Sequence, residues 1–515
     1  MLAIRSARLA TLLSILAVSV VLPAAAQSVG SNKKTVNTAP YPLGNPVIRH
    51  MYTADAAPHV MPDGRVWMVT SVDSEDGGGY ETMHEYHAFS SADMVDWTDH
   101  GRVLHIDDVR VPGSPPADKY ALWAPDMIYR DGKYYLYYPV RILHSDQQKP
   151  DGGRVVTAYL GVAVSDHPGG RFTVVNPRIE GTRGIDPAVF IDDDGEAYLY
   201  WGSHMAARLA DNMTELADEP VQLDVGTDRF MEAVWMNKRD GRYYLSYHTK
   251  YDWKVRITAE NADDPNRARS ELAWSVGDSP MGPFTYGGTL NYELGVHVAN
   301  GPRHPGGDFV PWRLTQSNHG GIVEFHGREY LFYHTSALSS WRQDAFAAEG
   351  TWTQRSVCID RIDYTADGRI IPVQQTIEGV EPVEIDQPFR IDLPIGEAAD
   401  VTDARREGGG LRLAGNPAVV RFADVDLGSG YYFFGAVRSG SGAKARIEVR
   451  LGGPGGPLAG TVRFGRASDG LAETFLRAAR GRHDICLVII QDENDTQALF
   501  SDFHFSAGAP TRLDE

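Results

Sequence analysis

One pattern of hydrophobic and polar positions recurs five times between residues 40 and 375. Each copy has a turn glycine followed by a β-prone run rich in aromatic residues, and another β-prone run precedes the turn. The copies read GRVWMVTS from Gly64, GKYYLYYP from Gly132, GEAYLYWG from Gly195, GRYYLSYH from Gly241 and GREYLFYH from Gly327. Asp-Gly and related turns between such runs are typical of β-hairpins. The pattern therefore predicts five hairpins.

Further β-prone runs with their own turns follow several copies, so each repeat is predicted to be a small antiparallel sheet of about four strands. The turn glycines are 68, 63, 46 and 86 residues apart, which is too irregular for a solenoid but compatible with a propeller whose loops vary. Helical patterns are scarce in this region. We therefore predict a five-bladed β-propeller for residues 27–380, and a β-sandwich with coincidental hairpins is the alternative.

Beyond a connector with little periodicity, residues 390–515 show a different pattern. Gly-rich turns separate alternating runs such as AVVRFADVDLG, ARIEVRLGG and HDICLVII. Alternation of this kind is typical of a β-sandwich. The chain is thus predicted to be all-β, with a five-bladed β-propeller followed by a jelly-roll-like β-sandwich domain.

The first 26 residues have the plan of a secretory signal peptide. Arg5 and Arg8 precede an apolar stretch over residues 9–22, and three alanines follow before Gln27. The stretch is short for a membrane span, and no later run approaches about 20 apolar residues. The sequence therefore predicts an exported protein, periplasmic or extracellular, with no membrane span.

Charge and cysteine content narrow the classes of partner. The formal net charge of −19 becomes −21 without the signal peptide, which argues against nucleic acid as a partner. Cys358 and Cys486 are the two cysteines, and they are far apart in the sequence. A disulfide framework is excluded, and we expect two buried free thiols, with a bridge between domains as the alternative.

Distances from the turn glycines identify candidate catalytic residues. Asp55, Asp186 and Glu232 each lie nine residues before the turn glycine of their own repeat. The innermost strand of a propeller blade lines the axis, so these carboxylates are predicted to converge on the central channel. Converging carboxylates repel one another, which suggests an acid/base reaction or a metal site, with a structural polar network as the alternative.

Other polar positions fit the repeat less well. His319 lies eight residues before Gly327, close to the equivalent position. Asp126 lies only six residues before Gly132, and this odd difference from nine predicts that its side chain points the other way. We therefore expect Asp126 to be a structural or supporting acid, apart from the other three. The acids of residues 192–194 are explained by the turn itself, since Asp is favoured there.

Glycoside cleavage needs two carboxyl groups in different states. One protonates the leaving oxygen while the other acts at the anomeric centre, and a separation of about 6.5–9.5 Å leaves room for the water used in inversion. Glu232 precedes the apolar run AVW, which suits a protonated general acid. Asp55 is then the candidate general base, and Asp186 the carboxylate that orients and tunes the acid.

Several segments together resemble glycoside hydrolase family 43. They include NPVIRHMYTADAAPHV, LWAPDMIYRDGKYYLYYP, GIDPAVFIDDDGEAYLYWG and FMEAVWMNKRDGRYYLSYHT, and the resemblance covers roughly residues 40–375. It implies a five-bladed propeller and an inverting mechanism with Asp55 as base, Asp186 as pKa modulator and Glu232 as acid. No cofactor is required, but the family's channel histidine, which holds water or a calcium ion near the axis, corresponds to His319.

The resemblance also implies three substrate-binding residues. Trp123 corresponds to an aromatic wall for the sugar, and Arg355 to an arginine near the bound sugar. His87, with His84, could rim the pocket. Each has a structural alternative: a buried core Trp, a salt-bridged core Arg and an outward polar position on a strand.

Residues 390–515 resemble a carbohydrate-binding module of family 6, notably in VRFADVDLGSGYYFFGAV and the closing FSDFHF. The sugar-stacking Gly-Trp stretch of such modules is replaced by RASDGLAETF, and no Trp follows Trp352. The domain could pack against the propeller without binding sugar, or it could remain a binder. A calcium ion held by Asp392 and Asp502 is a further possibility, although the motif expected there reads IDLPIG.

The predicted protein is an exported inverting glycosidase that acts on hemicellulose or pectin side chains or oligosaccharides. An α-L-arabinofuranosidase, a β-xylosidase or both are expected, with an arabinose-, xylose- or galactofuranose-containing glycan as partner. A β-D-galactofuranosidase and a non-catalytic glycan-binding propeller are the alternatives. A retaining propeller glycosidase such as an invertase is a further rival, but its motifs are not found.

Overall fold

The computed structural model describes residues 37–506, except for positions 38, 111–118, 151, 153, 251–270, 293–317, 347–349, 352, 386, 389, 441–442, 467–469, 478 and 494–496. In these ranges the chain is all-β apart from one α-helix, α1 (Ala337–Asp344), and short 3-10 turns. No helix in the same ranges is both long and apolar enough to cross a bilayer. The predicted signal peptide lies outside the described residues.

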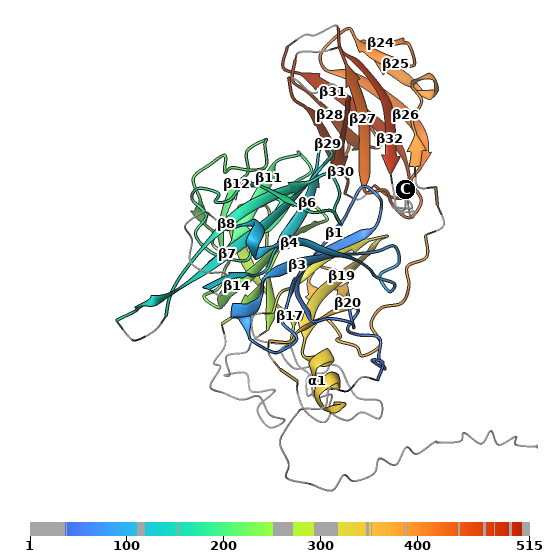
Figure 1. Cartoon of the computed structure of the whole chain (residues 1–515). Coiled ribbons are helices and arrows are strands. Elements are labelled where there is room, and N and C mark those ends of the chain that lie inside the picture. Colours follow the sequence, from blue (N-terminus) through green and yellow to red (C-terminus); the bar gives the residue numbers. More distant parts are fainter. Residues whose placement is uncertain are drawn as a thin grey trace, which may run out of the picture. The chain divides into compact units, whose positions relative to one another are not determined.

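The strands before residue 372 form five antiparallel sheets that follow one another along the chain (Figure 1). The first contains β1 (Thr53–Val60), β2 (Val66–Val72), β3 (Glu85–Ser91) and β4 (Thr98–His105). The second contains β5 (Tyr120–Leu122), β6 (Asp126–Arg130), β7 (Lys133–Gln148), β8 (Arg154–Ser165) and β9 (Thr173–Asn176). The third contains β10 (Ala188–Ile191), β11 (Ala197–Trp201), β12 (Met205–Arg208) and β13 (Val221–Gln222).

The fourth sheet contains β14 (Phe230–Arg239), β15 (Arg242–Thr249), β16 (Leu272–Gly277) and β17 (Phe284–Asn291). The fifth contains β18 (Gly321–Phe325), β19 (Arg328–Thr335), β20 (Ser356–Tyr364) and β21 (Ile370–Ile371). In each of the five sheets, the hairpin predicted from the repeat joins one of these strands to the next, from β1–β2 to β18–β19.

The hairpin turns have the backbone that their residues favour. Asp131, Asp240 and His326 all have φ of 49°, and the glycine after each also has a positive φ. Two successive positive φ values define the type I′ turn, whose twist matches that of the flanking strands. Gly64 and Gly195 also have positive φ, but they close longer turns. This difference in turn length becomes important at the candidate site.

The aromatic run after each turn forms a strand in the middle of its sheet. β15 and β19 are buried at every position except the first, and β11 is buried throughout. A strand covered on both faces needs apolar residues on both, so its sequence loses the usual alternation. This explains why the repeats read as continuous apolar runs.

The strands that precede the turns form a ring. β1, β6, β10, β14 and β18 contact one another in chain order, and β18 also contacts β1. Asp55 and Glu232 lie on β1 and β14, whereas Asp186 and His319 each come two residues before β10 and β18. These four residues therefore lie at the same end of the ring, where the first strands begin.

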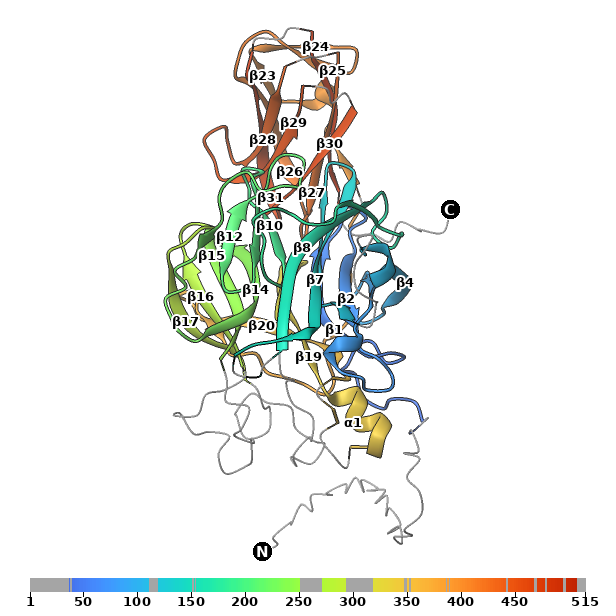
Figure 2. The ribbon, with the colours of Figure 1, turned by 60° about the vertical axis from the view of Figure 1, so that its left-hand side comes forward.

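The last part of the chain forms two further antiparallel sheets (Figure 2). One contains β22 (Arg390–Asp392), β24 (Ala404–Glu407), β25 (Gly410–Leu413), β27 (Phe433–Ser439), β30 (Gly470–Phe475) and β32 (Leu499–Ser506). The other contains β23 (Asp400–Thr402), β26 (Ala418–Asp426), β28 (Ala445–Leu451), β29 (Leu458–Phe464) and β31 (Arg482–Gln491). Buried and partly buried positions alternate along β28, and residues from both sheets form one hydrophobic cluster.

The two cysteines are confirmed as buried free thiols. Cys358 lies on β20 and Cys486 on β31. Neither is bonded to the other, so the alternative of a bridge between the two regions is wrong.

Candidate active site

His319 brings two of the predicted acids together. Its Nδ1 lies 3.0 Å from Oδ1 of Asp55, and its Nε2 lies 3.6 Å from Oδ2 of Asp186. The third acid is linked through the backbone, because the N–H of Ala233, next to Glu232, donates to Oδ2 of Asp186 at 3.1 Å. The first, third, fourth and fifth sheets therefore contribute to one cluster.

The backbone at these residues departs from regular strand geometry. Asp55, Asp186 and Ala233 have φ of 56°, 55° and 61°, in the left-handed region. The register shifts on β1 between Ala54 and Ala57 and on β14 on both sides of Glu232. Left-handed backbone costs about 1–2 kcal/mol for most residues, and bulges of this kind re-aim side chains and are frequent near active sites. The bulges at Asp55 and Glu232 re-aim these two side chains.

Asp126 lies deeper in the ring. It pairs with Tyr137, five residues after Gly132. The corresponding pairs at the candidate site involve the residue seven positions after the turn glycine: Ala54 with Ser71 and Glu232 with His248. β6 has no bulge, so Asp126 is displaced toward the turn by about 7 Å, two residues of strand.

Asp126 nevertheless points into the ring, contrary to the sequence prediction. Its Oδ1 lies 2.7 Å from Nε2 of His59 on β1, and its Oδ2 accepts from the N–H of Val189 on β10 at 2.6 Å. The predicted direction of the Asp126 side chain was wrong because turns of equal length and strands without bulges were assumed for every repeat. Asp126 bridges three sheets and does not contact the acid cluster.

Asp55 is held as a carboxylate by several donors. Nη1 of Arg355 donates to its Oδ1 at 2.8 Å, and the hydroxyl of Ser71 donates to its Oδ2. Burial alone would raise the pKa of Asp55, but Arg355 and His319 outweigh it and hold the pKa well below its usual value. Asp73 binds the other edge of Arg355, with two contacts of 2.9 Å. Asp55 is therefore ionised and fixed in direction, as a base must be.

The two groups next to Asp55 have pKa values that are shifted upward. Burial raises the pKa of Asp186; His319 lowers it in part, and the charges of Glu232 and Asp55 add to the rise. Burial lowers the pKa of His319, but Asp55 and Asp186 outweigh it and raise the pKa well above its ordinary value. An imidazolium thus lies between two carboxylates.

Glu232 is the most accessible of the three acids, with 16% of its side chain exposed against 3% for Asp55 and 5% for Asp186. Its Oε1 lies 3.8 Å from Nδ1 of the buried His248. A group that must pass a proton to a substrate needs such access, whereas an orienting group does not.

Trp123 and Arg355 lie at the two ends of one group of side chains. The ring of Tyr80 contacts the Trp123 ring edge-on at 6.3 Å between centroids, and the Arg355 guanidinium lies 5.1 Å from the Tyr80 centroid. Arg141 covers the Trp123 ring at 4.8 Å. Arg355 is itself buried and paired with carboxylates, so sugar contact by Trp123 or Arg355 stays a prediction.

His87 lies apart from the acids. It is on β3, the third strand of its sheet, and its charged partners are Asp99 at 3.2 Å and Glu85 at 3.7 Å. Its contacts among the described residues do not include the acid cluster. A substrate-binding role for His87 stays a prediction without a structural link to the cluster.

The residues expected to bind calcium contact other side chains of the protein. Both nitrogens of His319 face carboxylates, and Asp392 and Asp502 both bind the guanidinium of Arg390. Within the part of the chain that the structure describes, no group of three or more His, Cys, Asp or Glu residues is arranged for a metal ion. Metal binding by His319 or by the C-terminal region stays a prediction.

Several residues that support the cluster were not predicted from the sequence: Ser71, Asp73, Tyr80, His248 and His334. The N–H of Asp55 donates to Nδ1 of His334 at 3.1 Å, which requires that nitrogen to be unprotonated. Burial, together with Arg355, lowers the pKa of His334 well below its ordinary value, in agreement with this. Ser71, His248 and His334 each lie seven residues after a turn glycine, so the repeat could have revealed them.

A separate cavity of about 700 Å³ lies at the other ends of the first strands, and none of the three acids lines it. Cations cover aromatic rings there: the Arg239 guanidinium lies 3.9 Å from the Tyr364 centroid, and that of Arg477 lies 4.6 Å from the Phe190 centroid. Faces covered in this way are not available to stack on a sugar. The acid cluster is therefore the candidate active site.

Comparison with known proteins adds independent information. Residues 43–285 match the family described as glycosyl hydrolases family 43. The chain is 34% identical over 384 residues to xylosidase/arabinosidase 43A of Humicola insolens, covering 63% of this chain and 98% of that protein. It is 26% identical over 497 residues to the arabinoxylan arabinofuranohydrolase of Paenibacillus polymyxa, covering 86% of this chain and 71% of that protein.

A solved structure of a β-xylosidase/α-arabinofuranosidase from a compost microbial metagenome is also similar. It is 29% identical, covers 65% of this chain and 98% of its own, and has a TM-score of 0.48.

Proposed function

The chain belongs to family 43 of the glycosyl hydrolases, and from this premise we propose that Asp55, Asp186 and Glu232 are its catalytic carboxylates. The protein is a glycoside hydrolase that acts on hemicellulose. The proposed specificity is for α-L-arabinofuranosides, β-xylosides or both, since relatives named for each of these activities match the chain. A relative named as a β-D-galactofuranosidase also matches, which keeps that sugar as the second candidate.

In the proposed reaction Asp55 acts as general base. It accepts a proton from a water molecule, and the oxygen of that water attacks the anomeric carbon. Glu232 donates its proton to the leaving oxygen as the glycosidic bond breaks, so the configuration at the anomeric carbon is inverted. Asp186 holds the backbone beside Glu232 and, through mutual repulsion, favours the protonated acid.

One observation supports this assignment above the others: Asp55 and Asp186 share His319, and Asp186 binds the N–H next to Glu232. A non-catalytic glycan-binding protein has no need of three mutually repelling acids at one place. A strongly ionised base beside a more accessible acid matches the division of labour that hydrolysis requires.

We also propose a fold assignment. The ring of five sheets is interpreted as a five-bladed β-propeller, and the two C-terminal sheets as a sandwich related to carbohydrate-binding modules of family 6. Every Tyr and Phe in the described part of residues 390–506 is buried except the half-buried Phe475. Stacking on sugar needs exposed rings, so the proposed role of this domain is packing, not sugar binding.

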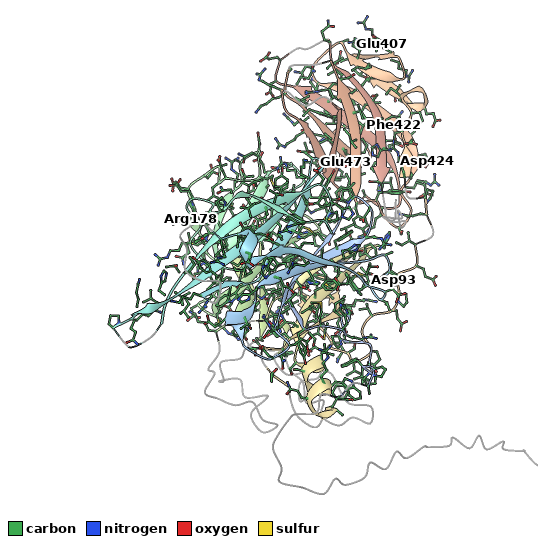
Figure 3. All side chains as sticks on the ribbon, in the orientation of Figure 1. Asp93, Arg178, Glu407, Phe422, Asp424 and Glu473 are labelled. Atoms are coloured by element: carbon green, nitrogen blue, oxygen red, sulfur yellow. The ribbon has the colours of Figure 1, made fainter. Side chains whose placement is uncertain are left out.

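Contacts between the C-terminal strands and the first part of the chain support that role. The hydroxyl of Tyr129 donates to Glu473, labelled in Figure 3, at 2.5 Å. Nη1 of Arg477 donates to Asp193 at 2.8 Å. Asp193, one of the turn acids predicted to be structural, is thus engaged in an ion pair. Separately, we propose that residues 1–26 direct export of the protein.

The test is a panel of 4-nitrophenyl α-L-arabinofuranoside, β-D-xyloside and β-D-galactofuranoside, with the first-released anomer followed by proton NMR. We expect cleavage of the arabinofuranoside, the xyloside or both, with inversion. Net retention of configuration would overturn the mechanism, and exclusive cleavage of the galactofuranoside would overturn the specificity.

A further inference from the structure

The strand that follows each turn glycine leads to one equivalent position, which contacts a candidate acid in the first, fourth and fifth sheets. It lies seven residues after the turn glycine and is occupied by Ser71, Pro139, Gly202, His248 and His334 in the five sheets. In the second sheet, which has no acid at this level, the residue is Pro139, which has no donor. In the third it is Gly202, and there Asp186 is held by Ala233 and His319 of other sheets.

In the first sheet this position supports the acid of the same sheet. Ser71 is buried, its backbone pairs with that of Ala54, and its hydroxyl donates to Oδ2 of Asp55. The bulge at Asp55 frees the carboxylate from regular strand geometry, and the serine fixes its direction.

The fourth sheet repeats this arrangement with a different residue. His248 on β15 is fully buried, and its backbone pairs with that of Glu232 on β14. The register shifts on both sides of Glu232, so this pair is isolated in the ladder. The ring is aimed at the carboxyl group, with 3.8 Å between Nδ1 and Oε1.

A buried histidine is commonly a packing residue. Here, however, it occupies the position that is serine beside Asp55, and it faces the carboxyl group of the acid. In the fifth sheet the same position is His334, whose Nδ1 also binds a candidate catalytic residue, through the backbone of Asp55. A polar residue thus occupies this position in the first, fourth and fifth sheets, where it contacts a candidate catalytic residue. Packing alone does not explain this coincidence.

We propose that His248 is a positioning residue that aims the carboxyl group of Glu232 at the leaving oxygen. This rests on the proposed function, in which Glu232 is the general acid. Ser71 has the corresponding role for the base. The two residues should therefore affect different halves of the reaction.

Leaving-group dependence separates these halves. A 2,4-dinitrophenyl glycoside departs without protonation, whereas a phenyl glycoside of the same sugar needs the acid. The variants are His248→Phe, which keeps a ring but removes the ring nitrogens, His248→Asn, which keeps a polar group near the Nδ1 position, and Ser71→Ala as the matched variant on the base. Glu232→Gln measures the effect of losing the acid itself, and the unfolding midpoint of each variant monitors the fold.

We expect His248→Phe to lower kcat/KM on the phenyl glycoside about 10- to 100-fold more than on the dinitrophenyl glycoside, as partial loss of acid catalysis predicts. His248→Asn should restore most of the lost kcat/KM on the phenyl glycoside. Ser71→Ala should lower kcat/KM on the two glycosides by the same factor. If Glu232→Gln discriminates between the leaving groups but His248→Phe does not, the positioning role is refuted and the proposed function stands. If Glu232→Gln itself does not discriminate, the assignment of Glu232 as the acid fails.

Discussion

Strands β6 and β14 occupy the same place in their repeats, and each has an inward-facing acid. The two acids have different roles. Asp126 on the regular β6 bridges His59 and Val189 and lies toward the turn. Glu232 on the bulged β14 lies at the end of the ring where the first strands begin and is partly accessible. A short change in backbone register therefore separates a structural carboxylate from a candidate catalytic one.

The bulges on β1 and β14 act in the same direction. Extra residues move each acid away from the turn, and left-handed backbone at Asp55 and Ala233 re-aims the chain. Such a backbone persists only when surrounding contacts enforce it. At Asp55 these contacts come from Arg355, Ser71 and His334.

The largest expected effect is at Asp55. Asp55→Asn keeps the size of the side chain but removes the base, so kcat should fall about 10²–10⁴-fold. Azide is an anionic nucleophile that needs no general base, and adding it should restore release of the aryl group. The check is the rate with and without azide. A rate within a few-fold of the unsubstituted protein would place the base elsewhere.

Asp186→Asn should have the next largest effect, about 10²-fold in kcat, at the low end for loss of a proton-transfer group. The charges of Asp186 and Glu232 repel each other. Removing the Asp186 charge lets Glu232 lose its proton more easily, so the basic limb of kcat/KM against pH should move to lower pH. A basic limb that stays in place, or moves to higher pH, contradicts the tuning role.

Arg355→Gln should shift the acidic limb of the profile of kcat/KM against pH. Arg355 is the largest of the interactions that lower the pKa of Asp55, so its removal raises that pKa. The base then becomes protonated at a higher pH, and activity on the acidic side is lost first. The measurement is kcat/KM from about pH 4 upward. Arg361→Gln, at an exposed arginine on β20, the strand that begins directly after Arg355, is the control and should leave the profile unchanged.

The smallest effect on activity is expected at Asp126. Asp126→Asn replaces one acceptor by a donor that faces either His59 or the N–H of Val189, which should cost about 1–3 kcal/mol of unfolding free energy. Because Asp126 does not contact the cluster, kcat should change by less than about threefold, within the range of an indirect effect. Denaturant unfolding and steady-state rates measure the two quantities. If folded Asp126→Asn protein lost as much activity as Asp55→Asn, Asp126 on the regular strand β6 would not be a purely structural acid, and the comparison with β14 would fail.

Counting residues from the turn glycines found three acids that the structure places in one cluster. The count of nine was the same for Asp55 and Glu232 for different reasons. The first sheet has a longer turn and one bulge, whereas the fourth has a two-residue turn and two register shifts. The same count gave the wrong direction for the Asp126 side chain. The number of residues between an acid and its turn glycine includes both turn residues and bulge residues, and the count does not distinguish them.

The sequence by itself determined the all-β class, the hairpins, the change of pattern near residue 390 and the residue types of the candidate site. Alternation, turn residues and repeats are local properties, and they can be read along the chain. Only the tertiary structure decided that Arg355 is shared between Asp55 and Asp73, and that His319 lies between Asp55 and Asp186. These groups are up to 300 residues apart. Their ionisation depends on burial and on neighbours from other sheets, which no local pattern specifies.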